Sequence, residues 1–518
     1  MLVVAERNFS ETHITETDIV RKMVMKFSFI QPKLSEGSLD MCSSAWPPLG
    51  ILYCATILAN EGFEVSVLDQ GAKGFSTMQA VSWVRKENPD ILGLSVLSSS
   101  SREAERIARL VKDESKDICT VLGNYNPTFN AERILNKYSH IDVVVRGEGE
   151  MTCLELVRCL QKGRNLKKVD GITYRSAEGN VVATPERPLL KDVDSLPFPD
   201  RHLVDSEYTS RIFGAKTTTK KFTTLLSSRG CSFQCTFCAC RNFARGLWRP
   251  RSVQNIIEEL QLLYGEGYRE FLFVDDNFTL NQRRVARFCR ELRKNKLKIQ
   301  WFCDSRVSNC RSDVLREMVK AGCKILYFGV ESANQRILDY YKKDITPEQA
   351  RKATHKARKA GVDIIVGSFI VGAPDETREE IRKTLLFAQK IDIDVPSFNI
   401  LCAPVGSQLW NELVSKGYIV EDKHWEKGVF VPQVVPTALP FEEISSMIYE
   451  YFKAFYLDPK RLVSESLRMI SSRFRLGLLF NNLTQLDQIL KTVRRGVQFG
   501  QSNKGVEVMH TRPLLRNS

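Results

Sequence analysis

Residues 227–243 read SSRGCSFQCTFCACRNF and place Cys231, Cys235 and Cys238 on one short loop. The loop follows residues 222–226, whose apolar character predicts a buried strand. Soft thiolates on such a loop select an iron–sulfur cluster or zinc. A structural zinc site takes four protein ligands, whereas only these three cysteines belong to the motif. We therefore expect a cluster with one iron left open.

A second series of strands and helices continues from this loop. Short apolar runs alternate with helical patterns, and the runs occupy residues 222–226, 270–274, 299–303, 324–329, 362–371 and 397–401. Six βα units are too few for a closed eight-unit barrel, but they fit a partial (β/α)6 barrel of the TIM type. The thiolates would then lie at the carboxyl end of the strands, where barrel enzymes keep their chemistry.

The amino-terminal third of the chain also alternates strands and helices. Predicted strands cover residues 24–31, 63–68, 91–96, 119–122 and 141–145, with helical patterns such as 49–59 and 102–112 between them. This order predicts an α/β fold with a doubly wound, Rossmann-like parallel sheet, whose ligand lies beyond the carboxyl ends of the strands.

The net charge, the start of the sequence and the number of cysteines indicate which partners and which cellular compartment to expect. The 518 residues carry a net charge of +14, which favours anionic partners such as nucleic acid, phospholipid or a phosphorylated substrate, or reflects solvated charged faces. The sequence contains no clear nucleic-acid motif. The start of the sequence lacks a secretory pattern, and no window approaches a membrane span, so we expect a cytoplasmic protein. Fourteen cysteines then suggest metal ligation rather than disulfides.

The cysteine loop resembles the signature of the radical S-adenosylmethionine superfamily, a C-x3-C-x2-C loop with an aromatic residue before the third cysteine. Three later segments resemble further motifs of that superfamily in the same order: FVDDNF at 273–278, GVES at 329–332 and IVGAPDET at 370–377. The resemblance implies that Cys231, Cys235 and Cys238 ligate a [4Fe-4S] cluster. It also implies that S-adenosylmethionine is held by residues of the later motifs, namely Asp275, Glu331, Ser332, Gly372 and Glu376.

In that superfamily the reduced cluster passes one electron to the bound sulfonium, and the resulting 5′-deoxyadenosyl radical takes hydrogen from an unactivated carbon. The cofactor carries out this step, while the protein supplies orientation and excludes water. The resemblance therefore implies a one-electron reductant such as ferredoxin or flavodoxin as a partner, and an oxygen-poor, anaerobic setting. Cys240, just beyond the motif, is interpreted as an ordinary thiol.

The amino-terminal domain resembles the cobalamin-binding domain that precedes one large group of these enzymes. The similarity rests on PPLG at 47–50, residues 62–69, PDILGLS at 89–95 and VVRGEGE at 144–150. Small residues at strand ends let a planar corrin approach the backbone. The resemblance thus implies cobalamin as a cofactor, with four residues facing it: Ser95, Ser98, Gly123 and Gly147.

Two departures from the family pattern affect this expectation. The usual Gly-Gly turn reads GNYNPT at 123–128, and no Asp-x-His-x-x-Gly sequence offers a histidine to cobalt. We expect His140 to be a surface or capping residue and cobalamin to bind without a protein histidine on its lower face. A domain that keeps the fold and binds nothing is the alternative.

Domain boundaries follow from these patterns. We expect an amino-terminal tail at 1–23, the cobalamin-binding-like domain at 24–176, a Pro-containing linker at 177–208, the partial barrel at 209–410 and a helical, basic carboxyl-terminal region at 411–518. Helical patterns at 441–455 and 462–490 would either lie on an anionic membrane or cover the open side of the barrel. Four arginines after the cysteine loop would contact a phosphate or carboxylate or remain solvated: Arg241, Arg245, Arg249 and Arg251.

The favoured function is a cobalamin-dependent methyltransferase acting on an unactivated sp3 carbon. FYLDP at 455–459 resembles an element of related enzymes that act on lipids and tetrapyrroles, so the substrate is expected to be of that kind. Radical cyclisation or carbon–carbon coupling is the main alternative. Methylthiolation of transfer RNA and a non-enzymatic corrinoid or iron–sulfur carrier are less favoured.

Overall fold

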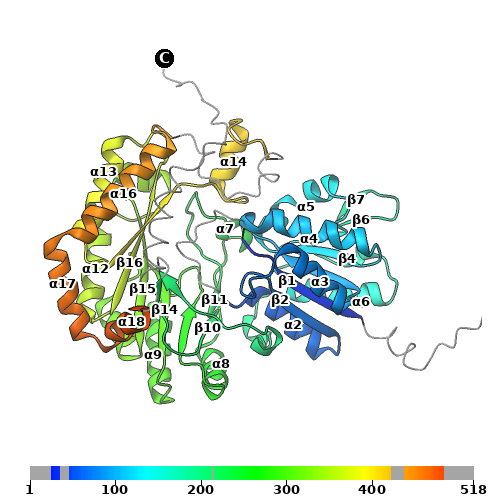
Figure 1. The fold of residues 1–518 in the computed structure, drawn as a ribbon, viewed down its shortest axis with the longest axis horizontal. Coiled ribbons are helices and arrows are strands. Elements are labelled where there is room, and N and C mark those ends of the chain that lie inside the picture. The colour runs from blue at the N-terminus through cyan, green and yellow to red at the C-terminus, as the bar shows by residue number, and fades with distance from the viewer. Residues whose placement is uncertain (1–24, 35–45, 213–214, 422–436, 484–518) are drawn as a thin grey trace, which may run out of the picture.

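The computed structural model describes residues 25–34, 46–212, 215–421 and 437–483 (Figure 1). These residues form two α/β domains that lie side by side, an amino-terminal domain and a barrel domain, and further helices lie against the barrel. The predicted tail at 1–23 is outside the described residues.

The amino-terminal domain is built on a seven-stranded sheet with the order β2-β1-β3-β4-β5-β6-β7. The first five strands of this order pair in parallel, and β6 and β7 are antiparallel additions at one edge. This confirms the doubly wound sheet. The strands are β1 (Lys26–Gln31), β2 (Glu64–Asp69), β3 (Ile91–Ser95), β4 (Cys119–Gly123), β5 (Val143–Val145), β6 (Ile172–Arg175) and β7 (Val181–Ala183).

Helices cover both faces of this sheet, so apolar strand residues on either face, such as Ile30, Leu92 and Val143, are buried. On one face α2 (Leu49–Asn60) and α6 (Glu150–Gln161) pack on side chains such as Phe27 and Val121. The other face is covered by α3 (Thr77–Glu87), α4 (Ser101–Glu114) and α5 (Tyr125–Lys137).

The predicted linker differs from the structure at one point. Residues 181–183 form β7, which pairs with β6 and extends the amino-terminal sheet. The prolines that favoured irregular backbone, Pro185, Pro188, Pro197 and Pro199, all lie beyond this strand. A three-residue edge strand is too short to produce a periodic pattern, so the sequence did not reveal it.

The barrel domain is a six-stranded parallel sheet with the order β10-β13-β14-β15-β16-β17, as expected for a partial barrel. Its strands are β10 (Phe222–Leu225), β13 (Glu270–Phe273), β14 (Gln300–Arg306), β15 (Cys323–Glu331), β16 (Ile364–Val371) and β17 (Val395–Ile400). The helices that follow them include α8 (Val253–Gly265), α9 (Gln282–Lys294), α10 (Ser312–Lys320), α11 (Gln335–Tyr340), α12 (Pro347–Ala360), α13 (Arg378–Lys390) and α14 (Gln408–Ser415).

Three helices follow: α16 (Phe441–Leu457), α17 (Pro459–Ser471) and α18 (Arg473–Asn482). The helix α16 packs beside α13, and its Tyr451 contacts Phe398 of β17, so it covers the outside of the last strands. Phe474 of α18 lies in the apolar cluster at the amino end of the barrel, together with Phe222 and Phe302. The structure has two helices where one was predicted at 462–490, and Ser472 lies between them. Residues 484–490 of this prediction are outside the described residues.

A buried ion-pair triad fastens the segment before the barrel to the barrel itself. The carboxylate of Glu259, on α8, forms ion pairs with Arg201 at 2.7 Å and with Arg251 at 2.5 Å. All three side chains are almost inaccessible to solvent. The charges of the two arginines hold the pKa of Glu259 below its usual range, although burial alone would raise it.

We predict that Glu259→Gln lowers the free energy of unfolding by about 3 kcal/mol, because two buried guanidinium groups lose their counter-charge. Urea denaturation followed by circular dichroism measures this. The matched control is Glu258→Gln, whose side chain is exposed on the same helix and should change stability by less than about 0.5 kcal/mol. Equal effects of the two substitutions would contradict the role of the triad.

Candidate functional site

The cysteine loop is closed at its base by a short antiparallel pair. Strand β11 (Ser228–Arg229) pairs with β12 (Arg249–Pro250), and the short helix α7 (Cys240–Phe243) lies between them. Within the loop, Thr236 donates its backbone N–H to the Tyr341 carbonyl at 3.0 Å. It also accepts the backbone N–H of Leu409 at 2.9 Å. The loop is thus fixed to the end of α11 and the start of α14.

The three motif thiols lie half-buried and close enough to affect one another. Burial raises the pKa of Cys231, and the neighbouring thiols Cys235 and Cys238 add to this. Among the described residues, no three His, Cys, Asp or Glu side chains converge as they would around a single metal ion. A cluster spans several atoms and separates its ligands further than one ion does. Three soft thiolates on one short loop fit an iron–sulfur cluster, as the resemblance to the superfamily implies.

Cys240 is buried immediately beside the loop. A hydrogen bond from its thiol to Cys238 lowers the pKa of Cys238 to about 7, and the same bond raises the pKa of Cys240. Cys240 is thus in contact with a predicted ligand, and its interpretation as an ordinary thiol rather than a fourth ligand stays a prediction.

Two basic side chains that the sequence did not single out surround Cys235. Arg306, at the carboxyl end of β14, has Nη1 3.7 Å from the Cys235 sulfur, and its guanidinium group lies 3.7 Å from the centre of the Phe233 ring. Its Nη2 is buried without a hydrogen-bond partner. Burial raises the pKa of Cys235, and the charges of Lys343 and Arg306 oppose this shift. The unpaired donor of Arg306 fits a polar or negatively charged ligand atom at this position.

The carboxyl end of β15 explains why Glu331 is held in place. Glu331 has a φ of 66°, and its carboxylate contacts Lys343 at 2.5 Å. A Cβ on Gly329 would lie 2.6 Å from the Glu331 carboxylate, so only glycine leaves room for this ion pair. The predicted Ser332 lies elsewhere, since its hydroxyl is fully buried and accepts the backbone N–H of Asn334 at 3.1 Å. Glu331 therefore reaches the cysteine loop through Lys343, and Ser332 supports the turn.

The two aspartates that follow β13 differ in their burial and in their hydrogen-bond partners. Asp275 is fully buried and accepts the Ser227 N–H at 2.7 Å and the Ser227 hydroxyl at 2.6 Å, as well as the Ser228 hydroxyl. Its neighbour Asp276 is exposed and accepts the Gly230 N–H at 3.1 Å. The carboxylate of Asp275 thus anchors the cysteine loop. Asp276, rather than the predicted Asp275, has the exposed carboxylate beside it.

The turn after β16 is organised by its own glutamate. Glu376 accepts the backbone N–H of Gly372 at 2.7 Å and that of Ala373 at 3.0 Å through one oxygen. The other oxygen is buried without a partner. Burial raises the pKa of Glu376 to about 7. The predicted residues Gly372 and Glu376 are therefore in contact, and one acceptor atom remains available to a ligand.

The four predicted cobalamin-facing residues lie together at the carboxyl ends of β3, β4 and β5. The segment at 123–128, which departs from the family pattern, links them. Asn124 donates to Ser95 at 2.9 Å, Asn126 donates to Ser98 at 3.0 Å, and Gly147 donates its N–H to Thr128 at 3.0 Å. A Cβ on Gly147 would meet no atom within 4 Å, and one on Gly123 only Val145 at 3.9 Å. This open, small-residue edge fits a planar corrin. His140 lies elsewhere, 3.2 Å from the carboxylate of Glu105.

Ion pairs that the sequence did not reveal join this edge to the cysteine loop. Arg229, two residues before Cys231, contacts Glu148 at 3.0 Å and Glu150 at 2.6 Å, and Arg249 contacts Glu148 at 2.7 Å. These side chains are only 9 to 12% exposed. The Tyr125 and Phe243 rings also stack across the two domains at 4.2 Å. The motif VVRGEGE, noted for cobalamin, thus also positions the loop.

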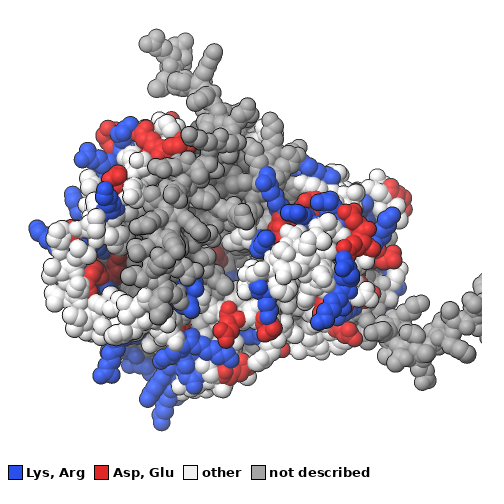
Figure 2. Space-filling model, in the orientation of Figure 1, with Lys and Arg blue, Asp and Glu red and all other residues white. Residues whose placement is uncertain are grey.

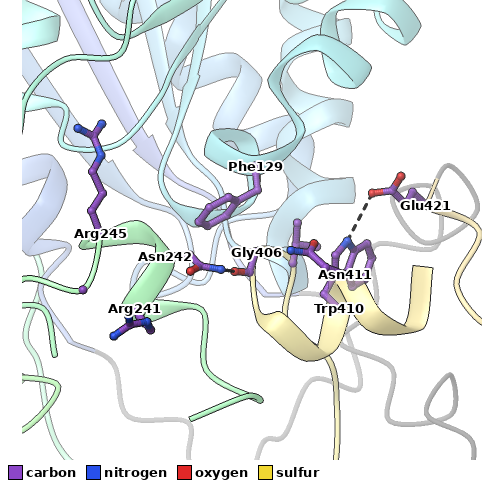
Figure 3. A pocket seen from close by; sticks show the side chains of 10 residues that line it. Phe129, Arg241, Asn242, Arg245, Gly406, Trp410, Asn411 and Glu421 are labelled. Carbon is purple, nitrogen blue, oxygen red and sulfur yellow. Dashed lines mark hydrogen bonds between the residues drawn. The ribbon is translucent and has the colours of Figure 1, made fainter. Parts of the chain in front are cut away.

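A cavity of about 510 Å³ lies beside α7 between the two domains (Figure 3). Phe129 of α5 reaches down to Gly406, whose carbonyl accepts Asn242 at 2.6 Å. Trp410 and Arg241 also line this cavity. Four arginines after the loop were expected to contact a phosphate or carboxylate or to remain solvated. Of these, Arg245, Arg249 and Arg251 form ion pairs with glutamates, whereas Arg241 donates to the carbonyl of Ser232.

Comparisons with known proteins agree with this geometry. Residues 225–388 match the family model "Radical SAM superfamily", and residues 42–157 match "B12 binding domain". An uncharacterized methyltransferase, PH0819, of Pyrococcus horikoshii is 35% identical over 85% of this chain and 95% of its own length. The anaerobic magnesium-protoporphyrin IX monomethyl ester cyclase of Rubrivivax gelatinosus is 30% identical over 84% of this chain and 78% of its own length.

Solved structures share the fold. The cobalamin-dependent S-adenosylmethionine radical enzyme OxsB has a TM-score of 0.66 at 18% identity, covering 93% of this chain and 80% of that one. The radical S-adenosylmethionine methyltransferase TsrM of Kitasatospora setae has a TM-score of 0.63 at 17% identity, covering 77% and 76%. Together with the cysteine loop and the sheet edge that faces it, these similarities show that the chain belongs to the radical S-adenosylmethionine superfamily, in the group that carries an amino-terminal cobalamin-binding domain.

Proposed function

We propose that the protein is a cobalamin-dependent C-methyltransferase acting on an unactivated sp3 carbon of a lipid- or tetrapyrrole-like substrate. We base this proposal on the direct contact between the cysteine loop and the open edge of the amino-terminal sheet. The contact consists of the ion pairs of Arg229 with Glu148 and Glu150. Two cofactors held at this junction would face one substrate. The methyltransferase name of the Pyrococcus horikoshii relative supports the same reaction type.

When bound, the cluster and S-adenosylmethionine supply hydrogen abstraction, and cobalamin supplies a transferable methyl group. The residues of this chain bind and orient these groups. Cys231, Cys235 and Cys238 would hold the cluster, with Arg306 and Lys343 placing positive charge beside Cys235. Arg306 Nη2 and the free oxygen of Glu376 would meet polar atoms of S-adenosylmethionine.

At the opposite edge four residues would face the corrin, namely Ser95, Ser98, Gly123 and Gly147. The stacked rings of Tyr125 and Phe243 close part of the junction and would exclude water from it. We infer that the substrate is a small molecule and that a ferredoxin or flavodoxin in the cytoplasm donates the electron.

Radical ring formation is the second candidate, because the Rubrivivax gelatinosus relative is named a cyclase. In that reaction a substrate radical closes a ring instead of accepting a methyl group. The two reactions need the same cysteine loop, so only the products distinguish them.

Anaerobic reconstitution with iron, sulfide and hydroxocobalamin should leave about four irons and one cobalamin on the desalted protein. Cys235→Ala should lose most of the iron and the cleavage of S-adenosylmethionine but retain cobalamin. Cys119→Ala, on β4 away from the loop, is the control that should keep both. Iron and visible absorption measure the outcome. An unchanged iron content in the Cys235→Ala variant would contradict the assignment of Cys235 as a cluster ligand.

Product counting tests the reaction type. With a tetrapyrrole or lipid substrate, methylation predicts equal amounts of 5′-deoxyadenosine and S-adenosylhomocysteine, because one S-adenosylmethionine would serve as the methyl donor and another as the source of the radical. Liquid chromatography of quenched single turnovers measures both. Formation of 5′-deoxyadenosine without S-adenosylhomocysteine would favour the cyclase instead.

A further inference from the structure

The helix α17 turns its apolar side to solvent and its charged side to the protein. Leu462, Val463, Leu467 and Ile470 are 51, 62, 65 and 72% exposed. No residue of α17 is buried. A surface helix ordinarily shows the opposite polarity, with apolar residues inward. The outward stripe therefore needs a covering partner.

The inward side of α17 shows that this orientation is fixed. Arg461 donates to the carbonyl of Ile393, and Arg468 lies 3.6 Å from the carboxylate of Asp394. Glu465 contacts Arg475 of α18 at 2.8 Å. Rotating α17 to bury its apolar stripe would break these ion pairs, so the stripe stays exposed.

The apolar stripe continues onto neighbouring residues of the same region. Leu457, at the end of α16, is 63% exposed, and Phe480 of α18 is 67% exposed. Both α17 and α18 lie at the amino end of the barrel, because Asp394 directly precedes β17 and Phe474 packs on the first residues of the strands. The cysteine loop is at the carboxyl end. The apolar face is thus on the opposite side of the barrel from the candidate site.

Basic side chains border this apolar face. The asparagines at the end of α18 hydrogen-bond to Lys216 and Thr218, which lead into a run of exposed lysines before β10. Figure 2 shows Lys and Arg side chains gathered along the lower edge of the molecule over α9, next to a largely uncharged surface over α17 and α18. The exposed basic residues before β10, on α9 and before β14 are Lys220, Lys221, Arg283, Arg287, Arg290, Arg293, Lys294, Lys296 and Lys298.

We propose that the face formed by α17, α18 and this basic border docks on an anionic membrane surface. An exposed apolar stripe flanked by Lys and Arg is the pattern of a helix that lies in the membrane interface. No helix among the described residues is long and apolar enough to cross a bilayer. Docking in this way leaves the catalytic end of the barrel turned away from the membrane.

The positive charge of this face argues against two other partners, a second copy of the chain and residues 484–518 of the same chain. A second copy of the chain would bring the same basic border against itself, and like charges oppose such pairing. Residues 484–518 carry six Lys or Arg and two Asp or Glu, so they too are basic. An anionic lipid surface complements both the apolar stripe and its border.

Flotation of the reconstituted full chain with vesicles tests the proposal. The protein should float with vesicles that contain phosphatidylglycerol and much less with pure phosphatidylcholine. The double substitution Leu467→Glu with Ile470→Glu should reduce binding about tenfold or more. The matched control, Met78→Glu with Leu262→Glu, changes two residues that are 55 and 52% exposed on other surfaces and should bind normally.

Three results would overturn the proposal. One is the absence of binding to anionic vesicles, and another is unchanged binding of the α17 variant. The third is a dimer, detected by light scattering, that the α17 variant dissociates, since the occupant would then be a second copy. Cleavage of S-adenosylmethionine should be equal in all these variants, because α17 lies far from the cysteine loop. A failure of the membrane-docking proposal would therefore not contradict the proposed reaction.

Discussion

The ion pairs between Arg229 and the two glutamates of the amino-terminal domain hold the candidate site together. Arg229 stands two residues before Cys231, so its contacts to Glu148 and Glu150 fix the start of the cysteine loop against the edge of the other domain. Breaking a buried pair of this kind by removing one partner costs about 3 to 5 kcal/mol. These ion pairs, together with the stacked rings of Tyr125 and Phe243, fix the position of the cysteine loop relative to the edge of the amino-terminal sheet.

A second set of contacts fixes the same loop from the barrel side. Asp275 binds Ser227 and Ser228 immediately before Arg229, while Lys343 and Arg306 place positive charge at Cys235. Each of these residues comes from the carboxyl end of a different strand or from the segment that follows it. The parallel topology brings them together, which is why residues so far apart in the chain can serve one loop.

Most of the fold could be predicted from the sequence, because buried parallel strands leave strong apolar runs and the cysteine motif marks the start of the barrel. The site could be predicted in part. Cys231 and Glu376 stand in recognisable motifs, whereas Arg306 stands in none and becomes visible only when β14 places it beside Cys235. Asp275 and Asp276 are adjacent, and only the backbone direction decides which one is buried. The inverted polarity of α17 could not be predicted either, since a helical period does not show which side faces the protein.

The proposed function requires that one junction holds both cofactors within reach of a single substrate. Electron paramagnetic resonance of the full chain, with the cluster reduced and cobalamin in its one-electron-reduced Co(II) state, tests it most directly. We predict magnetic interaction between the two centres, seen as splitting or faster relaxation of the cobalt signal when the cluster is reduced. Two independent signals, each identical to that of protein loaded with one cofactor alone, would contradict it.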